Sequence, residues 1–185
     1  MGPNQILTLL KSAERSGYIG EPVSQLEHAL QAAHFAREAG APDSAILAAL
    51  LHDIGHLCAP EDADEMSGLG VLDHEGIGAR WLAQLGFSDD VCELVRGHVQ
   101  AKRYLTHRNP EYLRRLSDAS RGTLEFQGGP MTETEATAFE RDPRFKLKLA
   151  VRTWDERAKV VGLLVPGLET YAPALNALCG SRPVS

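Results

Sequence analysis

Hydrophobic residues recur along this chain mainly at the three- and four-residue spacing of helices, and alternating β patterns are nearly absent. Glycine, proline and capping residues mark where many of the expected helices begin and end. The pattern predicts an all-α fold. The expected helices cover residues 5–16, 24–39, 43–56, 73–85, 88–103, 110–118, a segment that follows a capping box at Thr132 and Glu135, a segment from 142 that carries Trp154 and Asp155, and 167–178.

Several boundaries rest on single residues. Gly40 fits the position after the second helix, Asp43 is expected to cap the third, and Asn109 followed by Pro110 is typical of a helix start. Segments 59–70 and 127–130 have the composition of loops. Because no repeat or linker interrupts the pattern, we expect one domain over residues 1–185. Its core would span about 18–160, with a C-terminal helix and a frayed tail over 167–185.

The third predicted helix carries the first sign of chemistry. Residues 45–51 are apolar around the whole circumference of the helix, which indicates burial on all sides. This helix leads directly into His52 and Asp53, and a buried carboxylate without a partner is costly. For a His-Asp dipeptide taken alone, an ordinary buried hydrogen bond is the more frequent explanation.

Three further histidines change that balance. His28, His74 and His98 lie on three separate predicted helices, and each falls on the apolar face of its helix. One such histidine is more often a core residue than a ligand. Three of them beside His52 and Asp53 are hard to satisfy with hydrogen bonds alone, and the set predicts a metal site.

Asp155 adds a second carboxylate late in the chain. Four imidazoles and two carboxylates without a thiolate fit Fe, Mn, Co, Ni or Zn better than a structural zinc cage. Six ligands are too many for one ion that keeps positions open for substrate, and they suit two ions bridged by Asp53. His56 could orient a ligand from outside this set or could be structural.

Composition narrows the function classes. The chain has 185 residues, of which 43% are hydrophobic and 24% charged, as in ordinary soluble proteins. Its net charge of −6 argues against a general nucleic-acid binder. The three cysteines have no C-x-x-C spacing, no stretch has the character of a signal peptide, and none approaches the ~20 apolar residues of a membrane span. We expect a cytoplasmic protein without nucleic-acid or membrane partners.

The order of the six candidate ligands resembles the dinuclear branch of the HD-domain superfamily, and several motifs narrow the likeness. Together they resemble the HD-domain mixed-valent di-iron phosphonate oxygenases of the PhnZ and TmpB type, across about residues 18–171. The resembling stretches are Tyr18-Ile19-Gly20-Glu21, Gln25-Leu26-Glu27-His28, Leu50-Leu51-His52-Asp53-Ile54-Gly55-His56, Gly97-His98-Val99, Ala101-Lys102-Arg103-Tyr104-Leu105, Leu116-Ser117-Asp118-Ala119-Ser120-Arg121, Gln127-Gly128-Gly129-Pro130-Met131 and Trp154-Asp155-Glu156.

The resemblance implies an HD-domain helical bundle with a dinuclear metal site in its core. It implies a mixed-valent Fe(II)/Fe(III) pair, with O2 as co-substrate, that cleaves the C–P bond of a small-molecule 1-hydroxyphosphonate in organophosphonate catabolism. The substrate would be (R)-1-hydroxy-2-(trimethylammonio)ethylphosphonate, giving glycine betaine and phosphate, or 2-amino-1-hydroxyethylphosphonate, giving glycine and phosphate. An upstream hydroxylase would supply it.

By motif position, the resemblance also assigns residues to each task. The irons would be held by His28, His52, Asp53, His74, His98 and Asp155, and the phosphonate would be bound by Lys102, Ser120, Thr123 and Arg152. Tyr18 and Glu21 would close over the site as catalytic residues, with Glu21 facing the positive nitrogen of the substrate. Taken singly, Lys102 and Ser120 could equally be surface residues.

Two other functions stay open at this point. A metal-dependent HD phosphohydrolase acting on a nucleotide or another phosphate ester would use a similar ligand set. A non-catalytic binding or signalling module of the same fold is the third possibility, although such a module has no use for six buried ligands.

Overall fold

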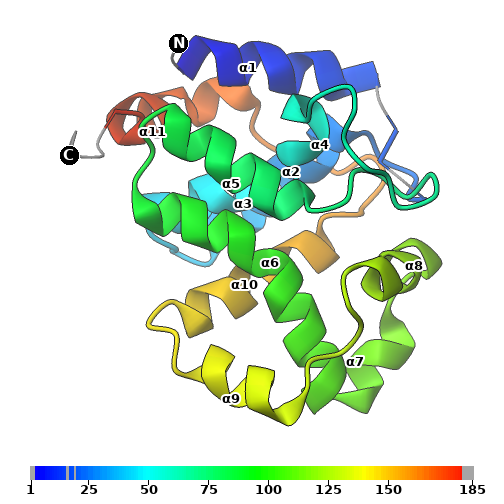
Figure 1. Ribbon diagram of the computed structural model, residues 1–185. Coiled ribbons are helices and arrows are strands. Elements are labelled where there is room, and N and C mark those ends of the chain that lie inside the picture. The colour runs from blue at the N-terminus through cyan, green and yellow to red at the C-terminus, as the bar shows by residue number, and fades with distance from the viewer. Residues whose placement is uncertain (1–2, 16, 19, 181–185) are drawn as a thin grey trace.

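The computed structural model describes residues 3–15, 17–18 and 20–180, and every regular element within these ranges is helical (Figure 1). Extended pairing in this part of the chain is limited to two isolated bridges, Gly17 with Ser24 and Glu65 with Val71. The all-α prediction is confirmed. Among the described helices, none combines the length and the apolar character needed to cross a membrane.

The longest connection between described elements joins α4 to α5. In chain order they are α1 (Pro3–Ser12), the 3-10 turn η1 (Ala13–Arg15), α2 (Gln25–Glu38), α3 (Asp43–Leu51), α4 (Gly55–Cys58), α5 (His74–Gln84), α6 (Asp89–Arg108), α7 (Pro110–Arg115), α8 (Asp118–Phe126), α9 (Glu133–Glu140), α10 (Phe145–Arg157), the 3-10 turn η2 (Leu168–Thr170) and α11 (Ala172–Leu178).

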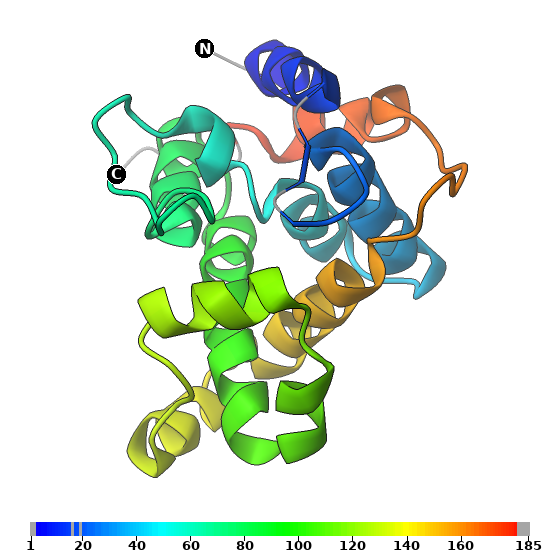
Figure 2. The ribbon, with the colours of Figure 1, turned by 90° about the vertical axis from the view of Figure 1, so that its right-hand side faces the viewer.

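The long helix α6 connects the two ends of the molecule (Figures 1 and 2). Its first half packs against α3, α5 and α10 in the main hydrophobic core, to which α1, α2 and α11 also contribute. Its second half extends toward α7 and α9 and shares a smaller core formed by Ala101, Met131, Ala136 and Phe139. The centre of α6 therefore lies where the two hydrophobic clusters meet.

Helix α3 is the buried helix that the sequence predicts. Ala45 and the run Leu47–Leu51 are at most 1% exposed. A helix buried on all sides cannot shift without disturbing several neighbours, because protein interiors are close-packed. The residues that follow it, His52 and Asp53, are therefore presented from a rigid element.

Several predicted boundaries are correct. Ser88 and Ser24 occupy N-cap positions, and Ser24 forms a capping box with Glu27. Asn109 accepts hydrogen bonds from the first backbone amides of α7, with Pro110 at the first helical position. Gly40 has a φ of 67°, which is the left-handed conformation expected after a helix.

Other predictions are wrong. The helix expected over 43–56 is broken after Leu51, and Asp43 is the first residue of α3 while Pro42 holds the cap position without a side-chain hydrogen bond. Helix α6 continues to Arg108, and α8 was not predicted at all. Helix α8 has only nine residues, which is too short a stretch to establish a helical repeat in the sequence. The tail expected to fray lies mostly outside the described residues.

Gly55 allows α4 and α5 to approach each other backbone to backbone. A Cβ atom at Gly55 would lie 1.9 Å from the carbonyl oxygen of His74 and 3.0 Å from the amide nitrogen of Gly78. Neither backbone atom can swing aside as a flexible side chain could. The glycine therefore fixes the start of α5, where His74 is located.

We expect Gly55→Ala to lower the free energy of unfolding by about 1–3 kcal/mol, because an added methyl group overpacks this contact. Urea unfolding followed by circular dichroism measures the change. Gly17→Ala is the matched control, since a Cβ at Gly17 meets no atom within 4 Å. Equal unfolding midpoints for the two variants would contradict this account of the α4–α5 contact.

Candidate metal centre

The six side chains predicted to bind metal converge from helices far apart in the sequence. His28 lies in α2, His52 directly follows α3, His74 begins α5 and His98 lies in the middle of α6. Asp53 follows His52, and Asp155 comes from α10. The four histidines and Asp155 are each at most 4% exposed. The structure thus brings the whole predicted set together.

The donors form two groups on either side of Asp53. In the first, Nε2 of His28 lies 3.0 Å from Nε2 of His52 and 3.4 Å from Oδ1 of Asp155. Nε2 of His52 lies 3.3 Å from Oδ2 of Asp53. These four side chains therefore enclose a single point.

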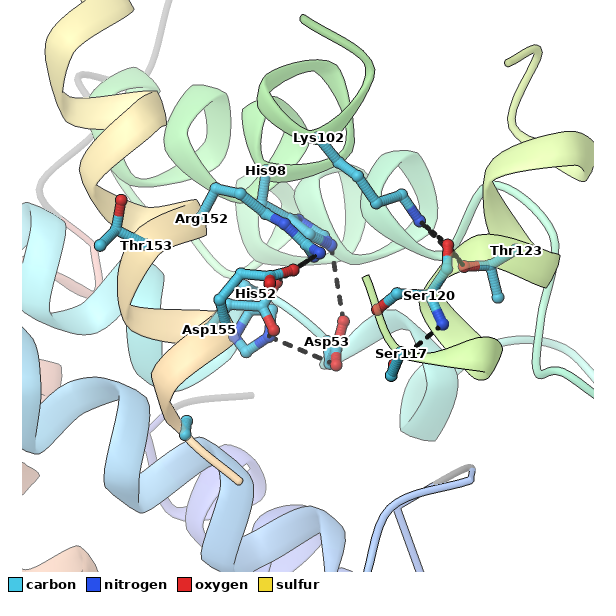
Figure 3. A network of polar contacts seen from close by, with 12 residues as sticks. His52, Asp53, His98, Lys102, Ser117, Ser120, Thr123, Arg152, Thr153 and Asp155 are labelled. Carbon is cyan, nitrogen blue, oxygen red and sulfur yellow. Dashed lines mark hydrogen bonds and ion pairs between the residues drawn. The ribbon is translucent and has the colours of Figure 1, made fainter. Parts of the chain in front are cut away.

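In the second group, the other carboxylate oxygen of Asp53 faces two histidines. Its Oδ1 lies 3.3 Å from Nε2 of His74 and 3.5 Å from Nε2 of His98. Those two Nε2 atoms are 3.1 Å apart. Asp53 thus presents one oxygen to each group, and Figure 3 shows it between His52 and His98.

The hydrogen bonds of the imidazoles decide which nitrogens are free to bind a cation. Nδ1 of His28 faces the carbonyl oxygen of Ala158 at 2.8 Å, and Nδ1 of His52 faces that of Ala49 at the same distance. Nδ1 of His98 lies 2.7 Å from the carbonyl oxygen of Val95. A carbonyl can only accept, so each Nδ1 carries the hydrogen and each neutral ring directs the lone pair of Nε2 inward.

Lone pairs that face one another at 3.0 Å require a cation between them. Oδ1 of Asp155 adds to this need, because it is buried and has no hydrogen-bond partner among the described residues. Two ligands bound about 2.1 Å from one ion at right angles lie about 3.0 Å apart. The observed donor separations fit that value, and the residues present therefore fit a pair of metal ions.

The charges of the site favour the ligand-competent forms. Burial opposes ionisation of Asp53, yet neighbouring His52 and His74 hold the pKa of its carboxyl well below the ordinary value. Burial likewise opposes ionisation of Asp155, and Arg152 and the histidines outweigh it, so its pKa is also well below the ordinary value. Burial, together with His52 and His74, lowers the pKa of His98. Carboxylates and neutral imidazoles are the forms that bind metals.

The pKa of His52 indicates that the site stabilises positive charge. Burial lowers its pKa, but Asp53 and Asp155 outweigh burial and raise the pKa well above the ordinary value. Two carboxylates so close together stabilise positive charge at this point, whether a proton or a metal ion supplies it.

His56 lies beside His74 but is not equivalent to the four histidines of the donor set. Its Nδ1 accepts a hydrogen bond from the backbone amide of Val71, so the hydrogen of the neutral ring is on Nε2. Burial and the neighbouring His74 lower the pKa of His56 to about 3, and the two rings stack with centroids 4.1 Å apart. Although His56, Asp53 and His74 lie close enough to hold an ion, this tautomer makes His56 a hydrogen-bond donor.

A cavity of about 60 Å³ opens beside the second group of donors. The four residues predicted to bind a phosphonate all line it: Lys102, Ser120, Thr123 and Arg152. Nζ of Lys102 donates to Oγ1 of Thr123 at 2.9 Å, and Figure 3 shows Lys102 pointing toward α8 across from Asp53. Burial and the nearby Arg152 lower the pKa of Lys102 to about 7. Burial and Arg152 thus oppose the positive charge on Lys102, and an anion bound beside these two side chains would stabilise that charge.

Arg152 is already engaged by the protein. Its Nη1 donates to Oδ2 of Asp155 at 2.5 Å, its Nε donates to the hydroxyl of Tyr112 at 2.7 Å, and its Nη2 donates to Glu156. A guanidinium has five N–H groups, so two remain for a ligand. Arg152 thus orients Asp155 as well as facing the cavity.

Tyr18 and Glu21 also line the cavity, in the loop before α2. The ring of Tyr18 stacks on the ring of His28 with centroids 3.8 Å apart. Burial and the carboxylates of Asp53 and Asp155 raise the pKa of Tyr18, which keeps the phenol protonated. The structure therefore places both loop residues next to the donor cluster.

Comparison with known proteins agrees with this geometry. The sequence profile described as the HD domain matches residues 25–123, and this stretch contains five of the six donors. The chain belongs to the HD-domain family. The matched HD-domain segment spans α2 to the middle of α8, and Asp155 is supplied from beyond it by α10.

Two relatives place this HD protein among phosphonate dioxygenases. The chain is 46% identical to hydroxymethylphosphonate dioxygenase of Gimesia maris, over 83% of this chain and 77% of that protein. It is 42% identical to the glycine-betaine-forming [1-hydroxy-2-(trimethylamino)ethyl]phosphonate dioxygenase of Leisingera caerulea, over 87% of this chain and 82% of the relative. An uncharacterized protein of Acanthamoeba polyphaga mimivirus is 42% identical over 91% and 77% of the two chains.

The two donor groups predict different effects for the two carboxylates. Asp53→Ala should reduce bound metal from about two ions per chain to nearly none, because it removes an oxygen from both groups. Asp155→Ala should leave about one ion, held by His74, His98 and Asp53. Plasma mass spectrometry of the purified proteins measures the metal.

Asp62→Ala, an exposed loop substitution, is the control and should bind metal like the unchanged protein. Equal losses in Asp53→Ala and Asp155→Ala would count against two separate groups of donors.

Proposed function

We propose that this HD protein is a metal-dependent oxygenase that cleaves the carbon–phosphorus bond of a small 1-hydroxyphosphonate in organophosphonate catabolism. One observation carries the proposal: four of the six metal-type donors, Asp53, His74, His98 and Asp155, line the same small cavity as the buried side chains of Lys102 and Arg152. The names of two relatives, both dioxygenases of hydroxyphosphonates, support it.

The proposed metals are two iron ions in a mixed-valent Fe(II)/Fe(III) pair. His28, His52 and Asp155 would hold one iron, His74 and His98 the other, and Asp53 would bridge them. When bound, an iron pair supplies the electrons and open positions that reaction with O2 requires. The absence of a thiolate among the donors supports iron over a structural zinc.

The surrounding side chains would bind and orient the substrate. Lys102, with Ser120, Thr123 and the two unused N–H groups of Arg152, would receive the phosphonate oxygens. His56 would donate its Nε2 hydrogen into the same cavity. Tyr18 and Glu21 would exclude water from the cavity, and Glu21 would face the substituent on the hydroxyl-bearing carbon of the substrate.

The candidate substrates differ in the substituent on the hydroxyl-bearing carbon. It is an aminomethyl group in 2-amino-1-hydroxyethylphosphonate, a trimethylammoniomethyl group in (R)-1-hydroxy-2-(trimethylammonio)ethylphosphonate, and a hydrogen in hydroxymethylphosphonate. The products from the first two would be glycine and glycine betaine, each with phosphate. We further propose that an upstream hydroxylase supplies the substrate and that the enzyme works in the cytoplasm. Cys58, Cys92 and Cys179, which form no disulfide, suit that reducing compartment.

An oxygen and phosphate assay tests the proposed reaction. Iron-loaded protein given these three hydroxyphosphonates should consume O2 and release phosphate in equal amounts with at least one of them, and should release none without O2. An oxygen electrode and 31P NMR follow the two quantities. Phosphate release that continues without O2 would instead support a metal-dependent phosphohydrolase, for which a nucleotide or another phosphate ester is the proper substrate.

Lys102 offers a separate test of the phosphonate position. Lys102→Met should raise KM about 10- to 100-fold, because it removes a charged hydrogen-bond donor from the anion. Lys102→Arg should recover part of that loss. Steady-state O2 consumption measures KM, and an unchanged KM in Lys102→Met would place the phosphonate elsewhere.

A further inference from the structure

An ion pair between Lys159 and Glu21 lines part of the cavity. Nζ of Lys159 lies 2.7 Å from Oε1 of Glu21, and the two side chains are 17% and 12% exposed. Both residues line the same cavity as the metal-type donors. The negative charge of Glu21 is therefore already balanced by the protein.

Lys159 is held in this position by the backbone on both sides of it. The carbonyl oxygen of Ala158 accepts the hydrogen bond from His28 described above. The amide of Val160 donates to Oε1 of Gln31 at 3.0 Å, and Nε2 of Gln31 donates to the carbonyl oxygen of Val160 at 2.8 Å. Two contacts to α2 thus flank Lys159 and direct it toward Glu21.

The loop that carries Glu21 is equally constrained. The amide of Glu21 donates to the carbonyl oxygen of Tyr18 at 3.0 Å. Gly20 has a φ of 72°, and a Cβ there would lie 2.7 Å from Cβ of Ala119 in α8. Gly20 therefore packs closely on α8, and the neighbouring Glu21 has little freedom to move away from Lys159.

We infer that Lys159 is a specificity-determining residue that selects a 1-hydroxyphosphonate without a positively charged substituent, of which hydroxymethylphosphonate is the simplest. A substrate ammonium group bound to Glu21 would lie beside the Lys159 ammonium, and like charges brought together in an enclosed site repel strongly. An uncharged substituent leaves the ion pair intact. This inference rests on the proposed function.

The volume and the lining of the cavity also favour a small substrate without a trimethylammonium group. A cavity of about 60 Å³ is far below the roughly 300–1,000 Å³ of sites for larger ligands. A trimethylammonium group prefers several aromatic faces around it. Apart from histidines, Tyr18 is the one aromatic side chain among the described residues that line the cavity, and its ring is stacked on His28.

The test compares kcat/KM for hydroxymethylphosphonate and 2-amino-1-hydroxyethylphosphonate, measured by O2 consumption with iron-loaded enzyme. The unchanged protein should prefer hydroxymethylphosphonate at least about tenfold. In Lys159→Met, an uncompensated Glu21 should attract the amine and shift the ratio about tenfold or more toward the amino compound. Lys159→Arg, which keeps the charge, should retain the original preference.

Two controls separate specificity from general damage. Lys146→Met removes an exposed lysine of α10 and should leave the ratio unchanged. The double variant Glu21→Gln with Lys159→Met removes both charges and should lose the gain for the amine, because the effect acts through Glu21. Lys159→Gln repeats the charge removal with a polar side chain, in case Lys159→Met folds poorly.

The outcomes are distinct. A ratio that does not move in Lys159→Met and Lys159→Gln, or a native preference for the amino compound, would overturn the inference while leaving the oxygenase in place. If the iron-loaded enzyme turned over neither of these compounds nor the trimethylammonio compound, the proposed function itself would fall.

Discussion

The structure depends on the convergence of four imidazole lone pairs and two carboxylates in a helical interior. Backbone carbonyls hold the Nδ1 hydrogens of His28, His52 and His98, so the inward direction of each Nε2 is built into the fold. Nε2 atoms 3.0 and 3.1 Å apart would repel one another without positive charge between them. Metal binding is therefore coupled to the packing of α2, α3, α5, α6 and α10, and the free energy of binding the ions would add to the free energy of folding.

Around that centre the protein separates its charges. The carboxylates of Asp53 and Asp155 belong to the donor cluster. Lys102 and Arg152 approach the cavity from α6 and α10, and α8 supplies hydroxyl groups near Lys102 (Figure 3). Arg152 belongs to both sides, because it fixes Asp155 while it faces the cavity. Lys159, four residues after Asp155, likewise neutralises the negative charge of Glu21. The cavity is thus lined both by the cationic side chains of Lys102 and Arg152 and by the Lys159–Glu21 ion pair.

Periodicity allowed the helical fold and three of the donors to be predicted, whereas the buried helix before His52 and Asp53 and the family resemblance indicated the others. His28, His74 and His98 stand out where an apolar residue is expected, and α3 is apolar all round. Features without periodicity could not be found this way. Helix α8 is too short to show a helical repeat, the close contact of Gly55 with α5 joins two separate elements, and the Lys159–Glu21 pair joins residues 138 positions apart. The tautomer of His56 depends on a backbone amide that no local pattern reveals.

Anomalous diffraction at the iron edge, from crystals of protein loaded with iron under anaerobic conditions, tests the central claim most directly. The account predicts two peaks about 3.5–4 Å apart, one on each side of the Asp53 carboxylate. A single peak, or side chains that keep these positions in iron-loaded protein without any peak between them, would contradict it.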